Sequence, residues 1–381
     1  MKIGILTFQS SHNCGSMLQA YALQHTLSSR LQAKAELINY SNRASRDIYG
    51  YIDLRPRKSS IKSNYLRFLN FNTVRKSRKE YNDFARKYLV QSSKRLFYSW
   101  QLKTIVRDYD LLVAGGDQIW NVRCPDAGKE YYLDFANDVP KVSYSPSLGG
   151  SNIFKFADNI DTYKHLLDDF KLLSVREPNG KYWLENLTKR KVEIICDPTL
   201  LLTKKDWFDL FDLPEDTDKY IFNYSFYHND AHVNKHLAMI SKKLNMPVVI
   251  MDHKQFDYYH LEKFGFIKSK HTGPKAFLSL MKNASLVLTQ SFHGTLFAAL
   301  FNKRFWSYNI DQYYSTDDDR AISILKQLGL EDKYVLIEDL TNLDLMKDIN
   351  FSIVNKNINE LRNKGLAYID QFSHIVDSYN K

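Results

Sequence analysis

The sequence predicts an α/β fold made of two domains, each with a parallel sheet. Short apolar runs typical of buried parallel strands recur along the chain, as at 2–8, 110–114 and 286–289. Each of these runs leads into a polar turn that contains glycine, and after the first and the last run a segment with apolar residues at helical spacing follows. The length of 381 residues is sufficient for two ordinary domains. We expect the two Rossmann-like domains to face each other across a cleft.

The first unit begins with a strand at 2–8, followed by the turn QSSHNCGS and a helix at 17–29. Ligands of such units lie beyond the carboxyl ends of the strands, where the start of the next helix offers free N–H groups to an anion. Asn13 and Gly15 are therefore candidate substrate-binding residues. The alternative is that both residues only serve the turn.

Residues 41–100 differ from the rest of the predicted first domain. Between Arg55 and Arg95 the sequence has thirteen lysines and arginines, interleaved with aromatic residues and opposed only by Glu80 and Asp83. This pattern predicts one or two amphipathic helices inserted into the sheet domain. A membrane-surface face and a groove for an anionic acceptor are both compatible with it, as is an ordinary solvated helix face.

The strand at 110–114 ends in Gly115 and Gly116, which permit a sharp bend and a close approach of a ligand. Asp117 and Gln118 follow at the strand end. An aspartate there is a candidate general acid or base, or a ligand for a substrate hydroxyl, and Gln118 is a candidate substrate-binding residue.

The segment 172–186 predicts a strand, the pair Arg176-Glu177 and a helix. An arginine at a strand end is suited to bind phosphate or carboxylate through two N–H groups. The alternative for Arg176 is an ion pair with Glu177 or with a neighbour.

An acidic stretch at 208–219 contains Pro214 and marks the predicted linker. We therefore expect an N-terminal domain over 1–210, with its basic helical insertion at about 41–100, and a C-terminal domain over 211–381. Helical spacing over 353–380 predicts a terminal helix, which we expect to pack back on the first domain.

The chain is organised around the segment 286–308 in the second domain. A buried strand at 286–289 leads into a polar elbow, and the helical segment LFAALF follows. His293 is the candidate catalytic residue of this elbow, and Ser291, Gly294 and Thr295 are candidate substrate-binding residues. The alternative is that His293 only caps the helix or forms a hydrogen bond in the core.

Composition limits the function classes. The formal net charge of +10 favours anionic partners such as phosphorylated substrates. The start of the chain lacks the features of a signal peptide, and no apolar stretch is long enough to span a membrane. Three cysteines far apart argue against a disulfide framework and against a zinc cluster. We expect a cytoplasmic location, with or without peripheral contact with the inner face of an anionic membrane.

Several ordered blocks resemble the polysaccharide pyruvyl transferase family. They span roughly residues 3–332 and read GILTFQSSHNCGSMLQAYALQ, DLLVAGGDQIWN, SVREPNG, DPTLLL, TGPKAFLSLMKNASLVLTQSFHGTLFAALFNKRF and DDRAISILKQLGLED. The resemblance implies a fold like the two-domain GT-B glycosyltransferases. It also implies phosphoenolpyruvate as donor and a hydroxyl pair on a sugar as acceptor. The product would be a cyclic pyruvate ketal on a surface polysaccharide, such as an exopolysaccharide or capsule, or on its lipid-linked precursor.

The resemblance also implies roles for individual residues. Arg176 and His293 would hold the donor, His293 could also supply a proton, and Asp117 would be the base or the ligand of the acceptor hydroxyl. No metal is required, and no cofactor is expected besides the donor substrate. Some members carry arginine two residues before the histidine, where this chain has Ser291. Arg320, near the start of the predicted helix 317–330, is the candidate replacement, with Lys303 or Arg304 behind it.

Two other functions remain open from the sequence. A sugar-nucleotide glycosyltransferase on the same architecture would need a carboxylate for the ribose, and Asp252 is the candidate. A basic glycan- or nucleic-acid-binding protein would use segment 55–95, although the sequence has no recognised nucleic-acid motif, so we expect no nucleic-acid partner.

Overall fold

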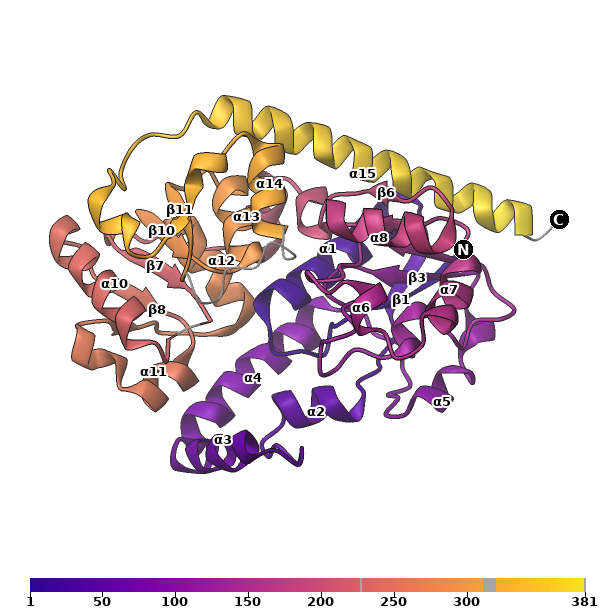
Figure 1. Cartoon of the computed structure of the whole chain (residues 1–381), viewed down its shortest axis with the longest axis horizontal. Coiled ribbons are helices and arrows are strands. Elements are labelled where there is room, and N and C mark those ends of the chain that lie inside the picture. The colour runs from indigo at the N-terminus through magenta and orange to yellow at the C-terminus, as the bar shows by residue number, and fades with distance from the viewer. Residues whose placement is uncertain (227, 311–319, 380–381) are drawn as a thin grey trace.

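The computed structural model describes residues 1–226, 228–310 and 320–379. Figure 1 shows two groups of strands, each covered by helices, with the N-terminal half of the chain on the right and the C-terminal half on the left. Among the described residues, every pair of strands in the sheets is parallel. The predicted α/β class with two Rossmann-like sheets is therefore confirmed.

The first sheet has the strand order β2 (Lys34–Leu37), β1 (Lys2–Leu6), β3 (Leu111–Gly115) and β4 (Lys141–Tyr144). A two-stranded sheet of β5 (Ser174–Val175) and β6 (Glu193–Ile194) continues it through a bridge from Val142 to Leu172. All residues of β3 and β4 are buried. Parallel strands covered on both faces lose their alternation of polar and apolar residues, which explains the continuous apolar run at 111–114.

The second sheet has the order β12 (Tyr334–Leu336), β11 (Phe305–Asn309), β10 (Leu286–Thr289), β7 (Ile221–Tyr224), β8 (Val248–Ile250) and β9 (Ile267–Lys268). The central strand β10 pairs with β7 and with β11, and all its residues are buried. The elbow that contains His293 therefore leaves from the middle of this sheet. The predicted domain boundary near residue 210 remains a proposal, and it lies in the segment that joins the two sheets.

The helices of the N-terminal half are α1 (Cys14–Arg30), α2 (Arg43–Tyr49), α3 (Lys58–Leu69), α4 (Phe71–Tyr88), α5 (Ser99–Leu102), α6 (Ile153–Phe156), α7 (Ile160–Asp168), α8 (Pro178–Thr188) and α9 (Lys204–Phe211). The C-terminal half has α10 (Ala231–Leu244), α11 (His253–Tyr259), α12 (Gly273–Asn283), α13 (Phe292–Leu300), α14 (Arg320–Leu328) and α15 (Phe351–Tyr379). Part of the predicted helix 317–330, residues 317–319, lies outside the described residues.

One hydrophobic core joins the two halves. Tyr21 of α1 contacts Phe211, with ring centroids 5.0 Å apart. Trp207 of α9 contacts Phe297 of α13 edge-to-face at 5.1 Å. These rings belong to the same buried cluster. Because apolar contacts fill this part of the junction, the N-termini of α1 and α13 are held next to each other.

Two helices reinforce the junction. The backbone N–H of Thr272, before α12, donates to a carboxylate oxygen of Glu80 in the basic helix α4 at 2.7 Å. The last helix, α15, runs along the top of Figure 1 from the left-hand sheet across the right-hand one. Its buried Arg362 donates to the carbonyl of Leu200 at 2.8 Å, and Asp370 pairs with Arg30 at 2.6 Å. Over the part of the chain that is described, no helix combines the length and the apolar character needed to cross a membrane.

Candidate active site

The site lies where the first turns of α1 and α13 meet. A Cβ atom added to Gly15 would lie only 2.1 Å from Nδ1 of His293. Only glycine therefore leaves room for the imidazole ring against the start of α1. Both helix starts place backbone N–H groups and the positive end of a helix dipole at this point, which favours an anion.

Asp197 joins His293 to Arg176. Its Oδ2 atom is 2.7 Å from a guanidinium nitrogen of Arg176 and 3.4 Å from Nε2 of His293. Its Oδ1 atom accepts hydrogen bonds from the backbone and the hydroxyl of Thr199. Burial acts to raise the pKa of the Asp197 carboxyl, but His293 and Arg176 hold that pKa well below its usual value. Asp197 is thus a buried carboxylate that orients both residues.

The guanidinium of Arg176 is surrounded by acidic and aromatic groups. Besides Asp197, it lies 3.7 Å from the carboxylate of Glu177 and 4.0 Å from the ring centre of Phe292. Burial raises the pKa of Glu177, while Arg176 and Arg320 act to lower it. The ion pair that the sequence left open for Arg176 is present, with Asp197 as the closer partner.

Asp117 projects from the end of β3 in a left-handed backbone conformation, with φ of +56°. Its Oδ1 atom accepts from the backbone N–H of Gln118 at 2.8 Å. A Cβ atom on the preceding Gly116 would overlap Gln19 of α1 and approach Pro198, so this turn packs directly against α1 and the Asp197 segment. A non-glycine residue in this backbone region is uncommon, and such residues concentrate at functional sites.

Several buried polar atoms around this point have no hydrogen-bond partner among the described residues. They include Oδ2 of Asp117 and Oε1 of Gln19, while Nε2 of His293, Nε of Arg176 and Oε2 of Glu177 have only the longer ion-pair contacts described above. An unpaired buried polar atom costs roughly 1–3 kcal/mol, so a group of them indicates that a ligand or ordered water completes the bonding.

Asp126 is a second carboxyl near Asp117. Burial raises its pKa to about 6, and the charge of Asp117 adds to the rise. Two neighbouring carboxyl groups, one of which titrates near neutral pH, suit proton transfer with a substrate hydroxyl.

The other predicted binding residues take structural positions at the edge of this cluster. Asn13 caps α1 by accepting from the backbone N–H of Ser16 at 3.3 Å. Gln118 accepts from the side chain of Asn121 at 2.9 Å and fills the space over Gly149, where a Cβ atom would lie 2.1 Å away.

In the elbow, the N–H of Ser291 donates to the hydroxyl of Thr289, which occupies the space that a Cβ on Gly294 would need. The hydroxyl of Thr295 is 2.5 Å from that of Ser307 and donates to the carbonyl of Ser291. These contacts fix the shape of the elbow that carries His293.

Arg320 belongs to the second half of the chain, and its charge acts on residues of the first half. Its positive charge acts to lower the pKa of Glu177 and the pKa of Cys124. Burial opposes this charge in both groups and raises the pKa of Cys124 to about 12. This places Arg320 within electrostatic reach of the cluster around Arg176.

A small cavity of about 90 Å³ lies beside Asn13. It is lined by groups from both halves of the chain, among them His12, Tyr81, His228 and Lys254. His12 stacks on Tyr81 of α4 with ring centroids 5.2 Å apart. Burial, with Arg78 and Lys254 nearby, lowers the pKa of His12 to about 3, so its ring is neutral at pH 7. The basic helix α4 thus forms one wall of this cavity.

Asp252 also borders the cavity, and its carboxylate is engaged. It accepts from the backbone N–H groups of Lys254 and Gln255 and from the Gln255 side chain at 3.1–3.2 Å. The carboxylate caps α11.

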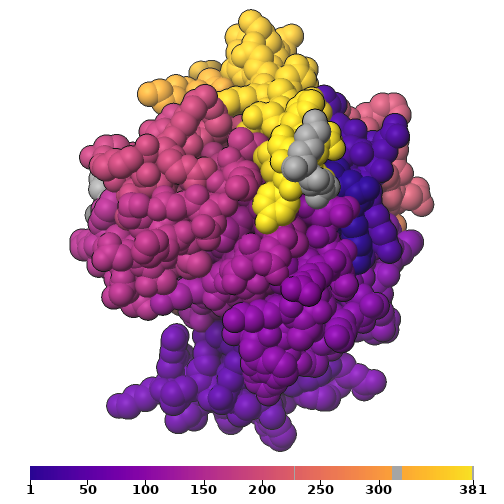
Figure 2. Space-filling view, turned by 90° about the vertical axis from the view of Figure 1, so that its right-hand side faces the viewer, coloured from indigo at the N-terminus to yellow at the C-terminus, as the bar shows by residue number. Residues whose placement is uncertain are grey.

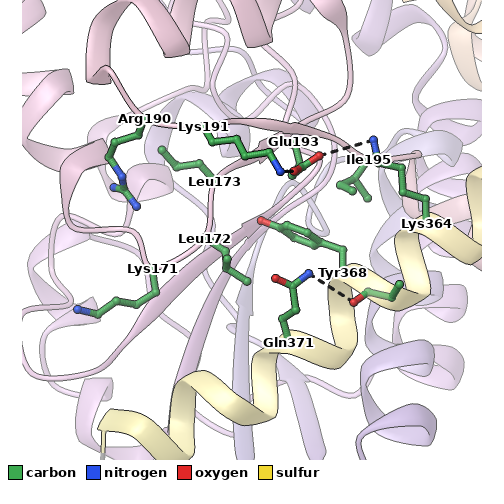
Figure 3. A pocket seen from close by; sticks show the side chains of 11 residues that line it. Lys171, Leu172, Leu173, Arg190, Lys191, Glu193, Ile195, Lys364, Tyr368 and Gln371 are labelled. Carbon is green, nitrogen blue, oxygen red and sulfur yellow. Dashed lines mark hydrogen bonds and ion pairs between the residues drawn. The ribbon is translucent and has the colours of Figure 1, made fainter.

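A larger pocket of about 640 Å³ lies between the β5–β6 strands and α15 (Figure 3). In Figure 3, Lys191 and Lys364 both turn toward Glu193, at 2.5 and 3.7 Å. None of the predicted site residues lines this pocket.

The sequence alone did not identify three residues of the candidate site, which are Asp197, Asp126 and His12. A signal for Asp197 was present, because it follows the apolar run VEIIC as Asp117 follows its own strand. No sequence pattern distinguished Asp126 or His12, since their burial depends on segments distant in the chain.

Comparisons with solved structures agree with the fold. A putative UDP-N-acetylglucosamine 2-epimerase from Listeria monocytogenes aligns with a TM-score of 0.53 and 9% identity, over 94% of this chain and 90% of that one. HepE from Anabaena, solved in complex with UDP and glucose, aligns with a TM-score of 0.50 and 10% identity, over 99% of this chain and 100% of that one. Such low identity shows the shared GT-B-like fold alone.

No curated protein matches the sequence. The family model described as polysaccharide pyruvyl transferase matches residues 13–312. This range includes all the predicted site residues except Arg320, and also includes Asp197. Because the match extends over most of the chain, the protein belongs to the polysaccharide pyruvyl transferase family.

Proposed function

We propose that this protein transfers pyruvate from phosphoenolpyruvate onto two hydroxyls of a sugar in a surface polysaccharide or its lipid-linked precursor. The product is a cyclic ketal, and phosphate is released. Family membership supports the donor and the acceptor class in general. The observation that carries the proposal is the group of unpaired buried polar atoms where α1 meets α13.

The donor carries a carboxylate and a phosphate, so its site needs N–H donors and cations. The starts of α1 and α13 supply N–H groups next to Gly15 and His293. Arg176 alone adds little net positive charge, because Asp197 and Glu177 both face it. Arg320 is the second cation that we assign to the donor.

The proton steps are assigned from the geometry around His293. The methylene carbon of the donor gains a proton, one sugar hydroxyl attacks the resulting oxocarbenium-like carbon, phosphate leaves, and the second hydroxyl closes the ring. His293 supplies that proton, and Asp197, whose Oδ2 lies 3.4 Å from Nε2 of His293, fixes the orientation of the ring.

Asp117 is the base for the attacking hydroxyl. Its unpaired Oδ2 atom can accept the hydroxyl proton, and Asp126 can share that proton because its pKa is about 6. The acceptor sugar then lies on the β3 side of the donor.

Product formation tests the proposal. The protein is incubated with phosphoenolpyruvate and a panel of hexose and N-acetylhexosamine glycosides, and phosphate release and the ketal methyl signal are followed by NMR. We expect both signals with wild type and their loss in His293→Ala. Phosphate release without any ketal, across a panel that includes lipid-linked glycans, would count against transfer to a sugar.

A further inference from the structure

Helix α3 packs on the protein through its polar face. The guanidinium of Arg67 donates to the carbonyls of Ile48 and Gly50, at 2.9 and 3.1 Å, at the end of α2. The side-chain amide of Asn64 brackets the backbone of Asp53 with two hydrogen bonds of 2.8 and 2.9 Å. This is the reverse of an ordinary surface helix, which buries its apolar face.

The apolar face of α3 points outward. Ile61, Tyr65, Phe68 and Leu69 are 74, 62, 79 and 58% exposed. Their spacing of four, three and one residues places them within an arc of about 100° on one side of the helix. Leu54, in the preceding loop, is 64% exposed as well. Large exposed apolar patches of this kind mark interaction surfaces.

The rim of this face is basic. From Leu54 to Leu69 the sequence contains no acidic residue, and Arg57 just before α3 is exposed. Lys58 and Lys62 are exposed one turn apart on α3. The nearest acid before the stretch, Asp53, is buried and paired with Arg55 at 2.6 Å. The surface therefore combines exposed aliphatic and aromatic side chains with an excess of positive charge.

We propose that α3 is an interfacial element that docks the protein on a bilayer of anionic phospholipids. The apolar face enters the region between headgroups and acyl chains, and the basic rim pairs with the headgroups. A second copy of the chain fits less well, because two basic rims would then repel each other.

The placement of α3 connects this surface to the site. The dark purple segment that contains α3 forms the lower edge of Figure 1 and projects below the body in Figure 2. The neighbouring helix α2 ends in Tyr49, whose ring lies 6.1 Å from that of His12 in the cavity wall. A membrane under α3 would present a lipid-linked acceptor to this cavity. That consequence rests on the proposed function, whereas the docking itself does not.

Vesicle sedimentation tests the docking. The purified full chain is mixed with vesicles of phosphatidylcholine, or with vesicles that also contain about 30% phosphatidylglycerol. We expect binding to the anionic vesicles that falls as salt is added. Ile61→Asp with Phe68→Asp should lower the partition coefficient about tenfold or more. Lys58→Glu with Lys62→Glu should lower it by a similar factor on anionic vesicles.

Matched controls use exposed residues on other helices. Tyr182→Asp with Met239→Asp removes apolar surface of similar exposure. Lys235→Glu with Lys242→Glu changes the net charge from +10 to +6, which is the same change that Lys58→Glu with Lys62→Glu makes on α3. Both controls should bind vesicles like wild type. Melting temperatures verify that each variant folds.

Three outcomes would overturn the proposal: no binding of wild type to anionic vesicles, equal losses in the control variants, or a wild-type dimer in solution that Ile61→Asp with Phe68→Asp dissociates. The last would make α3 a subunit interface. Activity on a water-soluble acceptor should be the same in all these variants, so failure of the docking is distinguishable from failure of the pyruvyl-transfer proposal.

Discussion

Replacing Gly15 with alanine tests the contact between α1 and His293. The added Cβ atom would lie 2.1 Å from Nδ1 of His293, whereas ordinary contact begins at 3.4 Å, so the ring or the helix must move by about 1.3 Å. Forcing an extra methyl group into a packed site costs about 1–3 kcal/mol. A displacement of roughly 1 Å in a reacting group lowers the rate about 100-fold. We therefore expect Gly15→Ala to lose about two orders of magnitude in kcat and a measurable part of its stability.

A double-mutant cycle shows whether the loss comes from this contact. His293→Ala removes the ring and creates room for the new methyl group, so Gly15→Ala should cost little further stability in that background. Urea denaturation of the four proteins measures the coupling, and phosphate release measures the activity. Wild-type activity of Gly15→Ala, or a stability cost that is the same with and without the His293 ring, would refute a steric contact between α1 and the ring.

Three further variants test other contacts of the site and the junction. Asp197→Asn should cost about 3–5 kcal/mol, measured by urea denaturation, because it leaves Arg176 buried with a weaker partner. A cost below 1 kcal/mol would show that the pair does not hold the site. Burial raises the pKa of Asp126 from 3.8 to about 6, so the folded protein favours the protonated carboxyl. The stabilisation from this proton is complete below pH 4 and is lost as the pH rises through 6. Asp126→Asn should therefore exceed wild type in stability by up to about 3 kcal/mol at pH 8 and by little at pH 4; a gain independent of pH would contradict this. Glu80→Ala should cost about 1–3 kcal/mol, because it removes the acceptor of the Thr272 N–H, whereas Asp83→Ala, one turn along α4 and more exposed, should cost less. Equal costs, from thermal melts of the two variants, would show that Glu80 does not tie α4 to α12.

The sequence was most informative where the chemistry is local. A buried strand and the polar turn with glycine that follows it are set by neighbouring residues, so these elements around Asp117 and His293 could be predicted from spacing alone. The position of these residues at strand ends followed from the rule that ligands lie at the carboxyl edge of a parallel sheet.

The remaining features depend on contacts between distant segments. Asp197 orients His293 from 96 positions away in the chain, and no local pattern reveals that pairing. The charge count over 55–95 identified an unusual segment but could not show how its two helices differ. In the structure α4 joins the second half of the chain through Glu80, while α3 turns its apolar face outward. Tertiary packing decides which face of an amphipathic helix is covered.

A thermal-shift titration shows whether the start of α1 and His293 form the phosphoenolpyruvate site. Phosphoenolpyruvate and UDP-sugars are titrated separately against wild type, His293→Ala and, as a control, Lys235→Glu. A ligand at about 100 times its Kd stabilises the folded protein by roughly 2.7 kcal/mol, which a melting curve resolves. We expect phosphoenolpyruvate alone to stabilise wild type and Lys235→Glu, and to leave His293→Ala unchanged. Stabilisation by a UDP-sugar without any effect of phosphoenolpyruvate would contradict the account and indicate a nucleotide-sugar enzyme.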